Sequence, residues 1–233
     1  MMKAMILAAG RGERMRPLTD SLPKPLLPLA AKPLIVYHIE ALARAGITDI
    51  VINHAWLGHL LEQQLADGRQ FGVRLQYSAE GETGLETAGG IRLALPLLGN
   101  EPFLVVNGDI HTDFDFATLL AQPVADVLAH LVLVPNPPQH PAGDFALLAD
   151  SGLVAASGAV QHTFSGMGVY RPEFFSTVPA GPQKLAPFLR HAMQSALVSG
   201  QLYQGYWADI GTPERLALAE HWQLQSERGQ HVG

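Results

Sequence analysis

Short apolar runs and amphipathic stretches alternate through the first half of the chain. Runs of β-prone residues bounded by turn-forming residues predict buried strands over residues 4–8, 49–53, 73–77 and 103–106. Apolar positions that recur every three to four residues predict helices over residues 34–45, 57–65 and 87–97. Alternating strands and helices are joined by right-handed crossovers. The pattern therefore predicts an α/β fold with a Rossmann-like, mainly parallel sheet flanked by helices.

The second half of the chain is less regular. Strands are predicted over residues 127–134, 168–170 and 203–207, and two short extended pieces over residues 145–148 and 153–156. A Pro-rich loop is expected at residues 135–141, and helices over residues 184–194 and 213–224. Neither a repeat nor a linker is visible, so we expect one domain over residues 1–233 with a small β-rich substrate lobe.

The charge balance narrows the choice of partners. Fifteen basic and 21 acidic residues give a net charge of −6, which argues against a nucleic-acid partner and against a membrane-surface protein. No apolar run approaches the roughly 20 residues that span a bilayer. The absence of cysteine excludes disulfides and thiolate nucleophiles and is compatible with a reducing compartment. We expect a cytoplasmic protein, either a monomer or a small homo-oligomer.

The cations are unevenly distributed along the chain. Five of the 15 fall within residues 11–32, together with only two acids: Arg11, Arg14, Arg16, Lys24 and Lys32. This segment follows the first predicted strand, and ligands of parallel sheets bind beyond the carboxyl ends of strands. The segment is either a solvated basic loop or the binding site of a small anion.

Glycines in the same segment favour the anion site. Gly10 and Gly12 resemble the start of a dinucleotide fingerprint, but its third glycine would fall at Met15. Backbone N–H groups at glycines can approach phosphate oxygens closely. Arg14 offers a planar fork for phosphate, and Lys24, between two prolines, offers a compact charge. The segment thus predicts a phosphate cradle rather than a dinucleotide site.

The longest motif of the chain lies in this segment. Residues 8–19 read Ala-Ala-Gly-Arg-Gly-Glu-Arg-Met-Arg-Pro-Leu-Thr and are followed by Pro-Lys-Pro at 23–25. This motif resembles the signature of sugar-1-phosphate nucleotidylyltransferases, which implies the nucleotide-diphospho-sugar transferase fold. The resemblance implies catalytic roles for Lys24, Arg14 and Asp109. The nucleotide contacts that it implies here are Ala9, Gly10, Arg11, Gly12, Glu13, Arg14 and Lys24.

A second motif resembles the base-recognition turn of the same family. Its usual core is Gly-Thr-Ala-Gly, and here Glu86 replaces the first glycine. A carboxylate can accept the N3–H of uracil or thymine or the N1–H of guanine, so Glu80 is the first candidate for the base and Glu86 the second. Gly89 is expected to contact the nucleotide. Close packing of the helix on the sheet explains Gly89 and Gly90 equally well.

Two aspartates are candidate metal ligands. Asp109 follows the fourth strand, and Asp209 lies in a Trp-Ala-Asp-Ile-Gly-Thr-Pro segment that also resembles a family motif. Two carboxylates from distant strand ends suit Mg²⁺, which completes its octahedron with phosphate and water. Either aspartate taken alone is as well explained as a turn former or a helix cap. Together with the loop motif they predict a site for Mg²⁺.

Several segments resemble one branch of the family, which uses UTP and N-acetylmuramate 1-phosphate in peptidoglycan recycling. They lie at residues 52–58, 85–87, 143–145 and 163–166. The resemblance implies that residues 1–112 bind the nucleotide and residues 113–233 the sugar phosphate. The expected sugar-phosphate contacts are Ala55, Asn107, Gly108, Asp144, Ser165 and Gly166.

Other assignments stay open at this point. The Glu-Lys-Pro motif of the glucose-1-phosphate relatives is absent, so the second phosphate-binding cation is unassigned, with Lys184 as a candidate. Asp144 can bind sugar hydroxyls or cap a turn. A thymidylyl- or guanylyltransferase acting on glucose or mannose 1-phosphate is the alternative within the family. A nucleotide-binding regulatory subunit without turnover is the alternative of another class.

Overall fold

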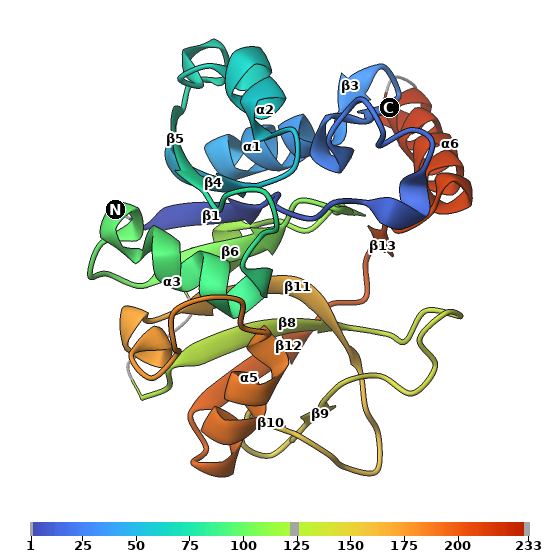
Figure 1. Ribbon diagram of the computed structural model, residues 1–233. Coiled ribbons are helices and arrows are strands. Elements are labelled where there is room, and N and C mark those ends of the chain that lie inside the picture. Colours follow the sequence, from blue (N-terminus) through green and yellow to red (C-terminus); the bar gives the residue numbers. More distant parts are fainter. Residues whose placement is uncertain (1, 122–125, 231–233) are drawn as a thin grey trace.

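A seven-stranded sheet forms the centre of the protein, whose computed structural model describes residues 2–121 and 126–230. The strand order is β12–β8–β11–β6–β1–β4–β5 (Figure 1). The strands are β1 (Lys3–Leu7), β4 (Asp49–His54), β5 (Arg74–Ala79), β6 (Phe103–Asn107), β8 (Ala129–Val134), β11 (Thr163–Tyr170) and β12 (Val198–Leu202). Six strands share one direction, whereas β11 pairs antiparallel with both β6 and β8. The prediction of a mainly parallel α/β sheet is confirmed.

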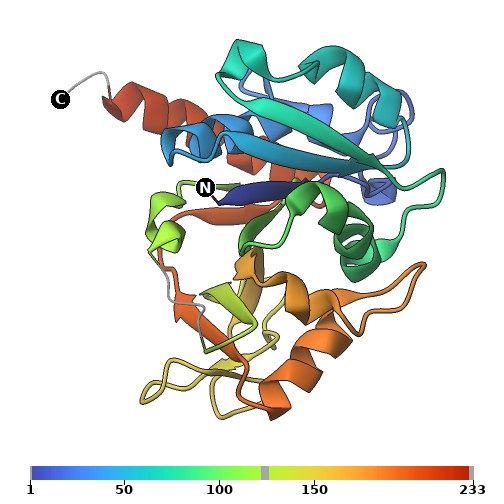
Figure 2. The ribbon, with the colours of Figure 1, turned by 90° about the vertical axis from the view of Figure 1, so that its left-hand side faces the viewer.

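Helices cover both faces of this sheet. Successive side chains of a strand point to opposite faces, so Ala4 and Ile6 of β1 belong to one core and Met5 to the other. Helices α1 (Leu34–Arg44) and α2 (Gly58–Leu65) pack on the first core, and α3 (Glu86–Leu98) and α5 (Leu185–Gln194) on the second. Figure 2 shows α3 and α5 together on one side of the sheet. Because helices cover both faces of the sheet, its strands are continuous apolar runs rather than alternations of apolar and polar residues.

Smaller strands and helices lie around the central sheet. Three two-stranded ribbons pair β2 (Pro28–Leu29) with β3 (Lys32–Pro33), β7 (Ile110–Thr112) with β13 (Trp207–Asp209), and β9 (Ala146–Leu147) with β10 (Val154–Ala155). The remaining helices are η1 (Glu13–Met15), η2 (Lys24–Leu26), η3 (Arg69–Phe71), α4 (Ala117–Leu120), η4 (Pro172–Phe175) and α6 (Pro213–Gln230). The β9–β10 ribbon and the loop from β8 form the small lobe expected from the sequence.

One predicted strand is wrong. Residues 203–206 lie between β12 and β13 instead of forming a strand, and Trp207 starts β13. Their aromatic side chains make tertiary contacts instead. The Tyr206 ring stacks on Trp222 of α6 with the ring centroids 3.6 Å apart, and the Tyr203 hydroxyl donates to Asp113. Of the seven strands of the central sheet, the one that the prediction missed is β12, which has a polar Ser-Gly-Gln centre at the edge of the sheet. Its edge position explains the weak apolar signal.

A third, small apolar cluster supports the long loop after β1. It joins that loop to α1 and α6 through Met15, Leu27, Leu29, Leu34, Ile210 and Ala219. The backbone N–H of Ala30 also donates to the Glu220 carboxylate of α6 at 3.0 Å. The closing helix therefore fixes the loop against the sheet, which positions the phosphate cradle.

Candidate active site

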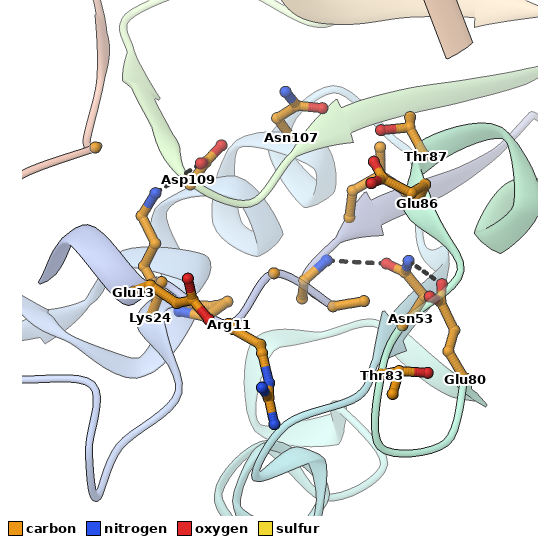
Figure 3. A pocket seen from close by; sticks show the side chains of 18 of the residues that line it. Arg11, Glu13, Lys24, Asn53, Glu80, Thr83, Glu86, Thr87, Asn107 and Asp109 are labelled. Atoms are coloured by element: carbon orange, nitrogen blue, oxygen red, sulfur yellow. Dashed lines mark hydrogen bonds and ion pairs between the residues drawn. The ribbon is translucent and has the colours of Figure 1, made fainter. Parts of the chain in front are cut away.

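A cavity of about 670 Å³ lies at the carboxyl ends of β1, β5 and β6, where the sequence placed the ligand. Figure 3 shows Lys24 and Asp109 at one end of it and Asn53 and Glu80 at the other. Its walls are Leu7, Ala8, Ala9, Gly10, Arg11, Gly12, Glu13, Arg14, Lys24, Pro25, Asn53, Glu80, Thr83, Gly84, Glu86, Thr87, Asn107, Asp109 and Gly211. The structure thus brings together all loop residues predicted to hold the nucleotide, and Glu80 and Glu86 with them.

Gly12 gives the loop its shape. It has a left-handed φ of 65°, and a Cβ atom at this position would lie 2.9 Å from Cγ2 of Thr19 and 3.2 Å from Cβ of Lys24. The Thr19 hydroxyl donates to the Gly12 carbonyl at 2.8 Å. A side chain would both strain the backbone and separate these contacts. Glycine therefore lets the loop fold back tightly enough to bring Lys24 into the cavity.

Lys24 and Asp109 form an ion pair on the cavity wall. The distance between Nζ and Oδ2 is 2.6 Å, and Lys24 is only 7% exposed whereas the Asp109 side chain is 43% exposed. The ammonium group has three donors, so the pair leaves two for a ligand. A buried ammonium is well suited to an incoming polyanion, because it is poorly screened by water.

Asn53 organises the opposite end of the cavity. Its Oδ1 accepts the Ala8 N–H at 2.9 Å, and its Nδ2 donates to Oε1 of Glu80 at 2.5 Å. The other oxygen of Glu80 accepts the Leu85 N–H at 2.6 Å. Burial raises the pKa of Glu80, and the bonds from Asn53 and Leu85 oppose that shift. Asn53 was not predicted as a site residue, although an amide at the end of an apolar strand is the signal that could have found it.

Glycines at the start of α3 allow close packing. A Cβ atom at Gly90 would lie 3.0 Å from Nδ2 of Asn53, and one at Gly89 would lie 3.2 Å from the Gln183 backbone nitrogen. Gly89 lies outside the cavity lining, so its observed contacts are those of close packing. Glu86 has a left-handed φ of 57° and lines the cavity. Glycine would occupy this conformation without strain.

A second cavity of about 290 Å³ adjoins the first and shares Asn107 and Asp109 with it. Its other walls are Ile110, Pro137, Gln139, His140, Asp144, Thr163, Phe164, Ser165, Trp207 and Asp209. Of the predicted sugar-phosphate contacts, Asn107, Asp144 and Ser165 line it. Gln139, His140, Thr163 and Trp207 were not predicted. Thr163 and Trp207 lie in segments that resemble family motifs but were not singled out there, and Gln139 and His140 come from a loop without a motif.

The two candidate metal ligands lie close to one strand pair: Asp209 ends β13, and Asp109 lies in the turn just before β7. Asp209 of β13 is opposite Ile110 of β7, and the Ile210 N–H donates to the Asp109 carbonyl at 2.7 Å. The Asp209 carboxylate accepts a hydrogen bond from Nε2 of Gln139 at 2.7 Å and forms an ion pair with Arg215. The described part of the chain holds no group of three or more His, Cys, Asp or Glu that can bind a metal ion. Two carboxylates fit Mg²⁺ when substrate phosphates supply further oxygens.

The remaining predicted residues line neither cavity. Gly108 donates its N–H to the Leu7 carbonyl at 2.8 Å, and Gly166, at a φ of 81°, packs on the Asn107 side chain. Ala55 lies near Gly84 outside both linings. Lys184 is exposed at the N-cap of α5 and lines neither cavity. The structure thus gives Lys184 no contact with either cavity.

Known proteins match this chain over nearly its whole length. Residues 3–226 match the nucleotidyl transferase family. The chain is 56% identical over 230 residues to the N-acetylmuramate alpha-1-phosphate uridylyltransferase of Neisseria meningitidis serogroup B, covering 95% of this chain and 100% of that protein. It is 31% identical over 250 residues to the mannose-1-phosphate guanyltransferase beta-A of Xenopus laevis, covering 99% of this chain and 67% of that protein.

A solved structure shares the fold. It is the crystal structure of a Bacillus anthracis protein assigned as a glucose-1-phosphate thymidylyltransferase, in complex with a sucrose. The TM-score is 0.83 at 22% identity, and the match covers 95% of each chain. At this identity the likeness bears on the fold alone. Separately, no helix in the described residues is long and apolar enough to cross a membrane.

Proposed function

The chain belongs to the nucleotidyl transferase family, and from this premise we propose that it transfers UMP from UTP to N-acetylmuramate 1-phosphate. The products are UDP-N-acetylmuramate and pyrophosphate, and the proposed role is in peptidoglycan recycling. The observation that carries the proposal is the Lys24–Asp109 pair at the border between two adjoining cavities. The larger cavity suits a nucleoside triphosphate and the smaller one a sugar phosphate. The 56% identity over 95% of the chain supports the choice of base and sugar.

Each half of the chain has its own task in this proposal. Residues 1–112 bind UTP, with the triphosphate along the loop that contains Gly10, Gly12 and Arg14 and the base near Glu80 and Glu86. Residues 113–233 supply most of the sugar-phosphate wall, including Asp144 and Ser165. Because both oxygens of Glu80 already accept protein hydrogen bonds, its task includes holding the loop that faces the base. UTP is a cytoplasmic nucleotide, so the proposal includes a cytoplasmic location.

The reaction joins the two substrates at the shared border. An oxygen of the sugar phosphate attacks the α-phosphorus of UTP, and the bond from that phosphorus to the β-phosphate's bridging oxygen breaks. The electron pair leaves with pyrophosphate. Lys24 neutralises the charge that grows on the α-phosphate oxygens, and the rigid loop holds the reacting atoms in line. The sugar phosphate is already anionic, so the step needs neither a protein nucleophile nor a general base.

Mg²⁺ is the cofactor that we propose for this site. Asp109 and Asp209 would hold it, since both line the second cavity, Asp209 on β13 and Asp109 in the turn before its partner strand β7. When bound, the ion neutralises phosphate charge and polarises the α-phosphate. Lys24, which pairs with Asp109 in the structure and lines the nucleotide cavity, would then be free to bind phosphate oxygens.

A grid of substrates tests the proposal. Pyrophosphate release is measured with UTP, dTTP, GTP and ATP against the 1-phosphates of N-acetylmuramate, N-acetylglucosamine, glucose and mannose. We expect the highest kcat/KM with UTP and N-acetylmuramate 1-phosphate. Turnover confined to dTTP or GTP would replace the uridylyl proposal by the thymidylyl or guanylyl alternative. Turnover with no pair would favour a regulatory subunit that only binds nucleotide.

A further inference from the structure

The second cavity is acidic in a way that conflicts with the proposed substrate. Three carboxylates line it, on Asp109, Asp144 and Asp209, and among the described residues no lysine or arginine does. N-acetylmuramate 1-phosphate brings a phosphate and also a lactyl carboxylate on the sugar ring. An unpaired carboxylate placed among carboxylates is repelled and loses its hydration. This inference rests on the proposed function, because a sugar 1-phosphate without the lactyl group brings no carboxylate that needs a partner beside the phosphate.

The basic partners of these aspartates differ in whether they line the second cavity. Lys24 pairs with Asp109, and Arg215 pairs with Asp209. Neither cation lines the second cavity, although Lys24 lines the first. His140 pairs with Asp144 and also lines the second cavity. Of the basic side chains in the described residues, His140 is thus the one that the sugar cavity exposes.

His140 is held in place before any ligand arrives. Its Nε2 lies 3.1 Å from Oδ1 of Asp144, and Oδ2 of Asp144 accepts the Phe164 N–H at 2.8 Å. Its backbone N–H donates to the Pro137 carbonyl at 2.9 Å. Asn136 braces the same loop by donating to the carbonyls of Pro141 at 3.1 Å and Gln161 at 3.0 Å. A preorganised group loses little entropy when it binds a ligand.

We propose that His140, oriented by Asp144, binds the lactyl carboxylate and so selects N-acetylmuramate 1-phosphate over sugar 1-phosphates without an acid group. The proposal uses the two ring N–H groups of His140: Nε2–H donates to Asp144 and Nδ1–H donates to the lactyl carboxylate. Asp144 then acts as a positioning residue, which agrees with the use of both its oxygens by protein donors. The side chain of His140 is 41% exposed, so a ligand can reach it.

A pair of substrates that differ only in the lactyl ether tests this assignment. His140→Gln removes the imidazole ring, and His191→Gln, at an exposed histidine of α5, is the matched control. For each protein we would measure kcat/KM with UTP and N-acetylmuramate 1-phosphate, and the KI of N-acetylglucosamine 1-phosphate as a competitor. Loss of a charge-assisted hydrogen bond should lower kcat/KM for the muramate substrate about tenfold in His140→Gln. The KI of the glucosamine competitor should change less than about twofold, and His191→Gln should match wild type in both.

The outcomes separate this inference from the proposed function. If wild type turns over the muramate substrate and His140→Gln does so equally well, the inference is overturned while the proposed function stands. Equal losses for both sugars would also overturn it, because they would show a structural role for the loop. If wild type does not turn over N-acetylmuramate 1-phosphate at all, both the proposed function and the inference are overturned.

Discussion

The two cavities are built in opposite ways. The nucleotide cavity, of about 670 Å³, takes nearly half of its walls from the continuous loop 8–14 with Lys24 and Pro25, and three cations, Arg11, Arg14 and Lys24, line it. The sugar cavity, of about 290 Å³, is assembled from four separate segments and is lined by three aspartates and His140. One cavity therefore attracts a polyanion, whereas the other needs help to accept one. The border between them, at Asn107 and Asp109, is where the two tasks meet.

This difference explains which changes should matter most. A group at the border serves both cavities, so its removal should cost more than the removal of a group that serves one. Groups that only support a wall should affect stability more than turnover. The predictions below follow this order.

Removal of the border pair should have the largest effect. Lys24→Ala or Asp109→Ala should lower kcat about 10²-fold or more, equivalent to about 2.7 kcal/mol, because each removes a key electrostatic group of the transfer step. The measurement is pyrophosphate release at saturating substrates and added Mg²⁺. Lys32→Ala is the control, since Lys32 belongs to the same basic segment but pairs with Glu40 and lines neither cavity. Near-normal turnover in both border variants would refute their assigned roles.

Low pH should destabilise the fold next to Asp109, through protonation of His38. His38 is fully buried and lies 2.8 Å from the Ile110 carbonyl, and burial lowers its pKa to about 4. The unfolded chain therefore binds the proton first, so this contribution to stability is complete above about pH 6.5 and is lost as the pH falls toward 4. From pH 7.5 to pH 5 the loss through His38 should be about 2 kcal/mol.

Urea unfolding at the two pH values measures this loss. His38→Gln should reduce the difference between them by about 2 kcal/mol, whereas His59→Gln, at an exposed position of α2, should leave it unchanged. An identical pH dependence in wild type and His38→Gln would contradict the assignment.

A change in the sugar cavity alone should be milder. Asp209→Asn should lower kcat about tenfold and raise the Mg²⁺ concentration needed for half-maximal rate, because one of two candidate ligands loses its charge. The Kd for UTP without Mg²⁺ should change less than about twofold, since Asp209 does not line the nucleotide cavity. An unchanged Mg²⁺ requirement would remove Asp209 from the metal site.

The smallest effect should be a gain in stability on the nucleotide side. Glu86→Gly should stabilise the fold by about 1 kcal/mol, or about 2–4 °C in Tm, because glycine adopts the left-handed conformation of this position without strain. The same variant should raise the KM for UTP if the carboxylate contacts the nucleotide. Glu82→Gly, in the exposed loop nearby, should bring no gain. A lower Tm for Glu86→Gly would contradict the strain argument.

The contrast between a cavity built from one loop and a cavity built from separate segments also explains which structural features the sequence predicts. The parallel strands and the phosphate loop were predictable, because an apolar run and a contiguous motif are local signals. The polar edge strand β12 was missed, and the strand expected at residues 203–207 was wrong, because the rings of Tyr203 and Tyr206 pack in tertiary contacts. His140 could not be predicted, since only the fold brings its loop to the sugar cavity. Trp207 stands two residues before Asp209 in a predicted site segment, but the segment does not indicate that the Trp207 side chain lines the cavity.

The account's central claim is that the sugar phosphate attacks the α-phosphate of UTP at the border between the two cavities. Its most direct test uses N-acetylmuramate 1-phosphate with ¹⁸O in the three non-bridging phosphate oxygens, followed by mass spectrometry of both products. The account predicts UDP-N-acetylmuramate that retains all three labelled oxygens and pyrophosphate that contains none. Label in pyrophosphate, or no formation of UDP-N-acetylmuramate, would contradict it.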